Sequence, residues 1–296
     1  MMRLRFRSIF ISDIHLGTVD CKSAYLLDFL RHTEAQQLYL VGDIIDLELL
    51  EKRPYWPVEH SAVLAEFLAI AARGTQVTYI PGNHDAPMRG LCGQKIGAID
   101  VRLNAIHRTA DGRRFRVCHG DEFDQSGVGK PWLIHLGEDA YRLLCWINRR
   151  FNAWRKYFKR PYLPLSIITK SRIGRALNYI RQYEQLAADA AREAGVDGLI
   201  CGHIHFGSMR EVDGVLYLND GDWVEHCTAL VEHFDGTLEL IHWSERHGSL
   251  ARTSRSEFVP LPAAAMALAG LDLGALIAQC SDAHASTNVD RKIVAV

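Results

Sequence analysis

Five short blocks of the sequence carry residues of the kinds that bind metal ions. Their aspartate and asparagine side chains supply hard oxygen donors and their histidines supply nitrogen donors, a mixture that suits Mn²⁺, Fe, Zn²⁺ or Co²⁺ better than Ca²⁺. In chain order the blocks are Asp13-Ile14-His15, Gly42-Asp43, Gly82-Asn83-His84-Asp85, His119-Gly120-Asp121 and Gly202-His203-Ile204-His205. Brought together, they would hold two divalent ions about 3.5–4 Å apart, which suits attack on a phosphate ester or anhydride.

The spacing of the donors suggests how two ions would be shared. Asp13 and His15 lie two positions apart and can reach one ion where the chain bends, and His205 would return to that ion. Asp43 could bridge both ions. The second ion would be completed by Asn83, His119 and His203. Two divalent ions beside two aspartates and a hydroxide leave a slightly positive site, which suits a phosphoryl group.

Other polar residues near the blocks have candidate roles that do not require metal binding. His84 could donate a hydrogen bond to a phosphoryl oxygen or protonate a leaving group, although it could also be a structural histidine. Arg89 could face a substrate phosphate or be an ordinary surface charge. Candidates for orienting the histidine ligands are Asp46, Asp85 and Asp121. Candidates for a wall of the site, or else for a buried turn, are Asp222 and Trp223.

Each block directly follows an apolar, β-branched run that is typical of a buried strand. These runs cover residues 8–11, 38–41, 77–80, 115–118 and 198–201. The donors are therefore expected at the carboxyl ends of strands, where open α/β sheets bind their ligands.

The first half of the chain alternates predicted strands and helices, which favours a mainly parallel sheet. The elements expected there are strands over residues 6–11, 38–41 and 76–80 and helices over about 23–34 and 58–72. Two hairpins are also predicted, with turns at Asp111-Gly112 and Asp235-Gly236. Their strands are expected over about 101–106 with 113–118, and over 227–234 with 237–243, after a strand over 215–218.

Residues 125–195 interrupt this alternation and are predicted to form a helical insertion. One helix is expected over about 132–154 and another over about 171–194. Residues 130–192 hold 13 Lys or Arg against 4 Asp or Glu, whereas the whole chain has a net charge of −1. A basic, aromatic-rich helix could be a solvated face, a substrate lid, a contact with an anionic membrane surface or a binding surface for single-stranded nucleic acid.

The length and the amino-acid composition of the chain are typical of a soluble globular protein. We expect one domain over residues 1–260 that contains the insertion, followed by a C-terminal tail over 261–296 with a helix near 263–277 and a partly disordered end. The chain has no apolar run near the roughly 20 residues of a membrane span, and its start leaves no room for a signal peptide. Seven scattered cysteines favour a reducing cytoplasm.

The order of the five blocks, DxH, GD, GNH, H and GHxH, resembles that of the calcineurin-like metallophosphoesterases over roughly residues 6–245. The resemblance implies an α/β fold of four layers, in which two mixed β-sheets are sandwiched between helices, with a dinuclear centre of the Mn, Fe or Zn type. It assigns one ion to Asp13, His15, Asp43 and His205. It assigns the other ion to Asp43, Asn83, His119 and His203, and the catalytic role to His84.

Finer features resemble the UDP-2,3-diacylglucosamine diphosphatase group. They include the stretch from Asn219 to Glu232 and the motif His119-Gly120-Asp121. Those enzymes hydrolyse the pyrophosphate of a lipid-linked UDP-sugar to UMP and a lipid monophosphate in lipid A synthesis, and a helical insertion holds the acyl chains. The established members carry Gly-Asn-Arg where this chain has Gly82-Asn83-His84, so the chain resembles a broader Gly-Asn-His branch.

The sequence thus predicts a phosphohydrolase with two divalent ions, Mn²⁺ above Fe or Zn²⁺. The expected substrate is UDP-2,3-diacylglucosamine or a related lipid-linked pyrophosphate. The expected location is the cytoplasm, with peripheral contact at the inner face of the membrane through the basic insertion. Two alternatives stay open: a phosphodiesterase or nuclease with the same centre, for which nucleic acid would be the partner, and a non-catalytic metal-binding scaffold.

Overall fold

The computed structural model describes residues 3–124, 150, 174–243, 248–253 and 258–260 of the chain. Its first half alternates strands and helices, so that three parallel strands lie side by side in the order of the chain. These strands are β1 (Leu4–Ile11), β2 (Thr33–Val41) and β3 (Gln76–Ile80). The helices that connect them are α1 (Ser23–His32), α2 (Leu47–Lys52) and α3 (Val58–Ala72).

The first sheet extends from these strands on both sides. On one side β3 pairs with β5 (Ile99–Val101), which pairs with β4 (Lys95–Ile96). On the other side β1 pairs antiparallel with β11 (Thr228–Glu232). The remaining strands on that side are β12 (Leu238–His242), β13 (Gly248–Thr253) and β14 (Phe258–Pro260). Within the described residues the order is β14-β13-β12-β11-β1-β2-β3-β5-β4.

The second sheet also mixes parallel and antiparallel pairs. Its order is β6-β7-β8-β10-β9, with β7, β8 and β10 parallel to one another. The strands are β6 (Ala105–Arg108), β7 (Arg114–Val117), β8 (Gly198–Cys201), β9 (Ser208–Val212) and β10 (Val215–Asn219). The strands that precede the fourth and fifth sequence blocks therefore lie next to each other, as β7 and β8.

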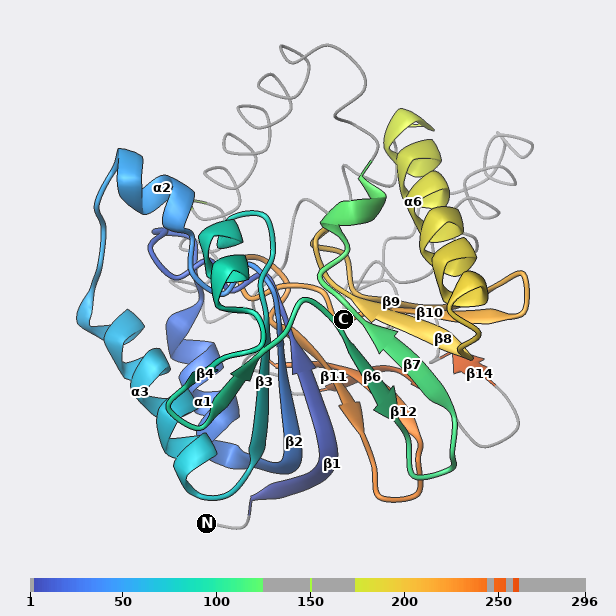
Figure 1. Ribbon diagram of the computed structural model, residues 1–296, viewed down its shortest axis with the longest axis horizontal. Coiled ribbons are helices and arrows are strands. Elements are labelled where there is room, and N and C mark those ends of the chain that lie inside the picture. The colour runs from blue at the N-terminus through green and yellow to red at the C-terminus, as the bar shows by residue number, and fades with distance from the viewer. Residues whose placement is uncertain (1–2, 125–149, 151–173, 244–247, 254–257, 261–296) are drawn as a thin grey trace, which may run out of the picture.

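Buried side chains join the sheets and helices into four layers (Figure 1). Successive side chains of a strand point to opposite faces, so Ile9 and Ile11 pack toward α1 and α3 while Phe10 packs between the two sheets. Full burial of such a side chain contributes about 1.5–3 kcal/mol. On the outer face of the second sheet lies α6 (Gly174–Glu193), which buries Tyr183 and Ala187. The predicted fold, two mixed sheets between helices, is confirmed.

Most predicted elements occur close to their predicted bounds, and the differences lie between the blocks. The strand expected over 101–106 is divided, because β5 ends at Val101 in the first sheet and β6 starts at Ala105 in the second. Helix α2 was not predicted, and it begins where Asp46 caps the backbone N–H of Leu49 (2.8 Å). Strands β4, β9, β13 and β14 were also not predicted.

Much of the predicted insertion and tail lies outside the described residues. This holds for the tail over 261–296 and, apart from Arg150, for the helix expected over 132–154. The helix expected over 171–194 corresponds to α6, which packs on β8 and β10 as part of the outer layer. The domain boundaries given above stay predictions.

Candidate metal centre

The five sequence blocks meet at one edge of the two sheets, in the loops that follow the strands (Figure 1). The loops after β1 and β2 are joined through their backbones, since Asp13 N–H donates to Gly42 O (3.1 Å) and His15 N–H donates to Asp43 O (2.9 Å). The turn after β10 joins them, because Trp223 N–H donates to Asp13 O (3.1 Å). These bonds fix the ligand-bearing loops before any ion binds.

Five of the candidate ligands have a left-handed backbone, which L-residues rarely adopt. Their φ angles lie between 49° and 69°, and they are Asp13, His15, Asp43, His203 and His205. Such conformations cost roughly 1–3 kcal/mol each and occur where the surrounding structure needs a side chain aimed in an unusual direction. Their concentration at one edge of the sheets supports a functional site.

Two glycines let the backbone approach the carboxylates. A Cβ atom at Gly82 would collide with Asp43 Oδ1, and one at Gly202 would collide with Ser12 Oγ and Asp13 Oδ2. Glycine is therefore required in the third and fifth blocks because the loops pass directly over the two aspartates.

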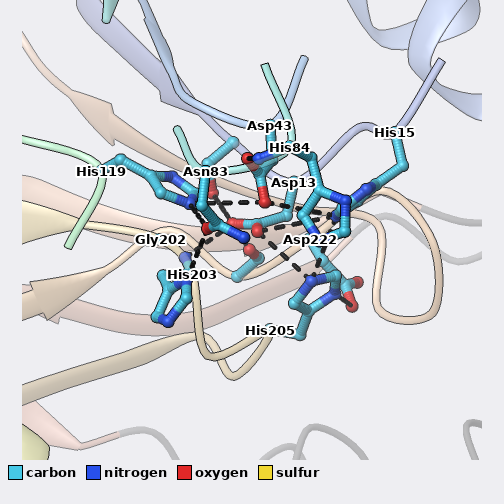
Figure 2. Close-up of polar contacts among 12 residues, drawn as sticks. Asp13, His15, Asp43, Asn83, His84, His119, Gly202, His203, His205 and Asp222 are labelled. Atoms are coloured by element: carbon cyan, nitrogen blue, oxygen red, sulfur yellow. Dashed lines mark hydrogen bonds and ion pairs between the residues drawn. The ribbon is translucent and has the colours of Figure 1, made fainter. Parts of the chain in front are cut away.

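Asp13, His15 and His205 form a first cluster (Figure 2). His205 Nε2 lies 3.3 Å from Asp13 Oδ1 and 3.3 Å from His15 Nε2. His15 Nε2 also lies 3.9 Å from Asp13 Oδ1. Three donor atoms from two sequence blocks, the first and the fifth, thus point at one another.

Asn83, His119 and His203 form a second cluster on the other side of the aspartates (Figure 2). Asn83 Oδ1 lies 3.2 Å from His119 Nε2 and 3.1 Å from His203 Nδ1. Asp43 Oδ2 lies between the clusters, 3.4 Å from His119 Nε2 and 3.8 Å from His15 Nε2. The structure therefore brings all seven predicted ligands together, with Asp43 in the bridging place.

The donors are arranged as a cation site requires. Asp13 Oδ2 accepts from Ser12 Oγ (2.5 Å) and from His203 N–H (2.9 Å), whereas Asp13 Oδ1 is buried and has no hydrogen-bond partner within the described residues. Asp43 repeats this pattern, since Oδ1 accepts from His84 N–H (2.8 Å) and Oδ2 faces the histidines. A buried carboxylate or amide oxygen that faces imidazole nitrogens needs either a proton or a metal cation between the donor atoms, so the residues fit two divalent ions.

The second nitrogen of each histidine ligand has a fixed partner, which decides the nitrogen that faces the cluster. For the first cluster the partners are carboxylates: Asp46 Oδ2 lies 3.1 Å from His15 Nδ1, and Asp222 Oδ2 lies 3.1 Å from His205 Nδ1. For the second cluster they are Val41 O, 2.9 Å from His119 Nδ1, and Asp124 Oδ2, 3.2 Å from His203 Nε2. Asp46, one of the candidates from the sequence, lies beside His15, whereas Asp124 and the Val41 carbonyl were not among the candidates.

Asp85 and Asp121, two further candidates for orienting histidines, show no hydrogen bond or ion pair with a histidine among the described residues. Asp85 accepts from the backbone N–H groups of Ile44 (2.9 Å) and Gly82 (2.5 Å) and from the Tyr79 hydroxyl, so it joins two loops. Asp121 pairs with Arg89 (2.6 Å). Asp85 therefore holds backbone groups in place and Asp121 pairs with the Arg89 guanidinium. These contacts do not support a role for either carboxylate in orienting the histidine ligands.

The three candidate substrate contacts divide into two buried side chains and one partly exposed side chain. The Asp222 and Trp223 side chains are fully buried, and Trp223 packs on Phe29 with ring centroids 5.3 Å apart, so neither side chain is accessible to a substrate. Arg89 is 37% exposed but already paired with Asp121. Of the three, Arg89 alone has a surface that a phosphate could reach.

In the centre, buried carboxylates and histidines stabilise the charged forms of one another. Burial disfavours the charged form of His119, but Asp43 outweighs burial and raises the pKa of His119 to about 10. Burial also opposes the charge of Asp43, yet His119 holds the pKa of that carboxyl well below its usual range. Burial acts likewise on His84, whose ion pair with Asp46 (3.2 Å) and the charge of Asp43 raise its pKa to about 9.

The chain belongs to the family of calcineurin-like phosphoesterases, whose sequence pattern it matches over residues 6–207. The match contains all five blocks. Together with the buried aspartate and histidine clusters, it defines the protein as a metallophosphoesterase with a dinuclear type of metal site.

Relatives with similar sequences include enzymes named UDP-2,3-diacylglucosamine hydrolase. A UDP-2,3-diacylglucosamine hydrolase of Haemophilus influenzae is 22% identical over 244 residues, which cover 76% of this chain and 94% of the relative. An enzyme of the same name from Aeromonas salmonicida is 27% identical over 240 residues, covering 76% and 89%.

Solved structures with similar folds include Yfce, a phosphoesterase from E. coli, with a TM-score of 0.44 and 14% identity over 83% of this chain and 97% of that one. They also include Vps29 complexed with zinc from Entamoeba histolytica, with a TM-score of 0.41 and 15% identity over 86% and 98%. Among the described residues, the helices are all too short or too polar to cross a membrane.

Proposed function

We propose that this metallophosphoesterase hydrolyses the pyrophosphate of UDP-2,3-diacylglucosamine or a closely related lipid-linked nucleotide sugar. The observation that carries the hydrolase part is the convergence of seven donor side chains in two facing clusters, with His84 at their rim. The substrate part is supported by the name that the relatives share and by the stretch from Asn219 to Glu232.

The first ion would be held by Asp13, His15, Asp43 and His205, and the second by Asp43, Asn83, His119 and His203. The proposed ion is Mn²⁺, with Fe or Zn²⁺ as alternatives, because the mixed oxygen and imidazole donors fit all three. When bound, two divalent ions would make a nucleophile available at neutral pH and would offset the charge of the phosphoryl oxygens. A site that is slightly positive attracts a pyrophosphate.

His84 lies outside both clusters and is the candidate acid. Its side chain is 34% exposed, its ring centroid lies 4.8 Å from that of His15, and Asp46 holds it in an ion pair (3.2 Å). With a pKa of about 9 it carries a proton at neutral pH. It would donate a hydrogen bond to a phosphoryl oxygen as negative charge develops, or give its proton to the departing phosphate oxygen.

Arg89 and the insertion are the candidate substrate contacts. The Arg89 guanidinium, which is partly exposed beside Asp121, would exchange part of that contact for a substrate phosphate. The insertion over residues 125–195 begins directly after Asp124, which contacts His203, and α6 returns to the same place through a hydrogen bond between Tyr179 and Asp124. This supports our proposal that the basic, aromatic insertion covers the centre and receives acyl chains at the inner face of a membrane.

The test is hydrolysis of UDP-2,3-diacylglucosamine with Mn²⁺ beside hydrolysis of bis-p-nitrophenyl phosphate. Wild type, His84→Ala and the control His32→Ala are compared, since among the described residues the polar contacts of His32 are to Asp28 on α1. Release of UMP that is faster than diester cleavage, is lost in His84→Ala and is retained in His32→Ala would support the proposal. Diester cleavage alone would discard the lipid substrate and favour the phosphodiesterase or nuclease alternative. Tight Mn²⁺ binding without turnover of either substrate would favour a scaffold.

A further inference from the structure

The turn between β10 and β11, residues 220–227, lies outside the five blocks but contacts the first cluster at several points. Its Trp223 N–H donates to the Asp13 carbonyl (3.1 Å). Its Asp220 Oδ1 lies 2.6 Å from Ser12 Oγ, which in turn donates to Asp13 Oδ2. Its Asp222 contacts His205. Two of the three residues of the first cluster are thus positioned by one turn.

The two oxygens of Asp222 have separate partners. Oδ1 accepts from the backbone N–H groups of Glu225 (3.0 Å) and His226 (2.6 Å), and His226 Nδ1 lies 3.2 Å away. Oδ2 lies 3.1 Å from His205 Nδ1. Because the backbone donors occupy Oδ1 and the side chain is fully buried, the carboxylate cannot rotate away from His205.

This contact determines which nitrogen of His205 carries a proton. An acceptor-only carboxylate oxygen requires a donor opposite it, so Nδ1 holds the proton and Nε2 presents its lone pair. That lone pair points at Asp13 Oδ1, 3.3 Å away. The same contact that orients the ring therefore prepares it to bind an ion.

We propose that Asp222 is a positioning residue that fixes the tautomer of His205 and thereby sets the affinity of the first cluster for its ion. The inference rests on the proposed two-ion centre. Asn83, His119 and His203 have other partners, so Asp222 acts on the first cluster and leaves the second cluster unchanged.

An Asp222→Asn substitution tests the tautomer directly. The backbone N–H groups of Glu225 and His226 require an oxygen at the Oδ1 position, so the amide nitrogen must face His205. His205 Nδ1 then has to accept, and its proton moves to Nε2, where it blocks the ion. Asp222→Ala instead removes the carboxylate contact without imposing the opposite tautomer on His205, although it also removes the acceptor that holds the turn.

The two substitutions are therefore expected to rank in opposite order in Mn²⁺ affinity and in unfolding temperature. Asp222→Asn is expected to lower the affinity of the first cluster for Mn²⁺ more than Asp222→Ala does, with a loss of about 10- to 100-fold. Asp222→Ala is expected to lower the unfolding temperature more, because it leaves two buried backbone donors without an acceptor. A residue that only stabilised the fold would give the same order in both measurements.

A matched control is Glu232→Gln. Glu232 is also a fully buried carboxylate, but its partners are Arg7, Ser8 and His107. None of these belongs to either cluster, so the control variant loses stability without a change in the metal centre.

The experiment is a calorimetric Mn²⁺ titration of each variant, with electron paramagnetic resonance to separate coupled Mn²⁺ pairs from single ions. We expect two ions for wild type and for Glu232→Gln, and one tight ion with an uncoupled signal for Asp222→Asn. Two ions bound with wild-type affinity in Asp222→Asn, or a greater affinity loss in Asp222→Ala, would overturn the inference. If wild type itself binds no pair of ions, the proposed function fails before the inference is reached.

Discussion

Replacement of Asp124 by asparagine should weaken the second cluster alone. Asp124 Oδ2 lies 3.2 Å from His203 Nε2, the nitrogen that faces away from Asn83. Loss of such a carboxylate partner typically costs about 10- to 100-fold in metal affinity. The Asp124 side chain is 24% exposed, so water weakens its field, and we expect the lower end of that range: about tenfold, or about 1.4 kcal/mol.

The assay is Mn²⁺ binding followed by turnover at limiting and at saturating Mn²⁺. Asp124→Asn should need about tenfold more Mn²⁺ for half-maximal activity, and it should regain most of its kcat when Mn²⁺ is in excess. Tyr179→Phe removes the hydrogen bond from α6 to Asp124 and should shift the same curve in the same direction by a smaller factor.

The matched control is Asp121→Asn. Asp121 lies three residues earlier in the 3-10 turn η2 (Asp121–Phe123), is 23% exposed, and pairs with Arg89 rather than with a histidine. The reasoning is refuted if Asp121→Asn shifts the Mn²⁺ curve as much as Asp124→Asn does. It is also refuted if Asp124→Asn loses the ion of the first cluster, since the histidine that Asp124 contacts, His203, belongs to the second cluster.

Three further predictions concern the proton and charge balance of the molecule. His84→Gln should lower kcat by about 10²- to 10³-fold while both ions remain bound. The activity of wild type should fall at alkaline pH as His84 loses its proton. The midpoint of this fall should lie at or below the pKa of about 9, because bound cations repel the proton of His84. The Mn²⁺ affinity of the second cluster should rise by up to about tenfold per pH unit between roughly pH 6.5 and 8.5. The reason is that an ion must displace the proton that His119 holds because of its raised pKa. Titrations at several pH values that give the same affinity would contradict this prediction. Glu232→Gln should lower the free energy of unfolding by about 3 kcal/mol at neutral pH, since Arg7 and His107 lose their counter-ion. The lowered pKa of Glu232 means that its contribution is complete above the ordinary value of 4.5 and is lost as the pH falls through the folded-state value, so urea unfolding should show wild type and variant converging in acid.

The ligands could be predicted from the sequence because their position depends on local structure. Each follows an apolar run that forms a strand, and parallel strands bring their carboxyl ends to one edge. The bridging place of Asp43 follows from β2 lying between β1 and β3. The four layers could also be predicted. The consecutive apolar residues Ile9, Phe10 and Ile11 point alternately to the two faces of β1, so both faces of its sheet must be covered.

The partners of the ligands could not be predicted, because they depend on turns whose geometry is decided by tertiary contacts. Asp121 and Asp124 are equally polar and lie in the same short turn, and it is the close approach of α6 and His203 that selects Asp124. Asp222 was a candidate for a wall of the site or for a buried turn, and the backbone donors of its own turn hold its carboxylate inward. The Val41 carbonyl could not be predicted at all, because every residue has a backbone carbonyl and the residue type does not show which one contacts His119.

The differences between the partners imply that the two clusters are not equivalent. His15 and His205 are oriented by Asp46 and Asp222, and both carboxylates are buried and held below their usual pKa range, which keeps them charged. The second cluster is oriented by a carbonyl and by the partly exposed Asp124, which adjoins the start of the predicted insertion. A change in the insertion would therefore reach the second ion first, so we expect that ion to be the one whose occupancy responds to substrate.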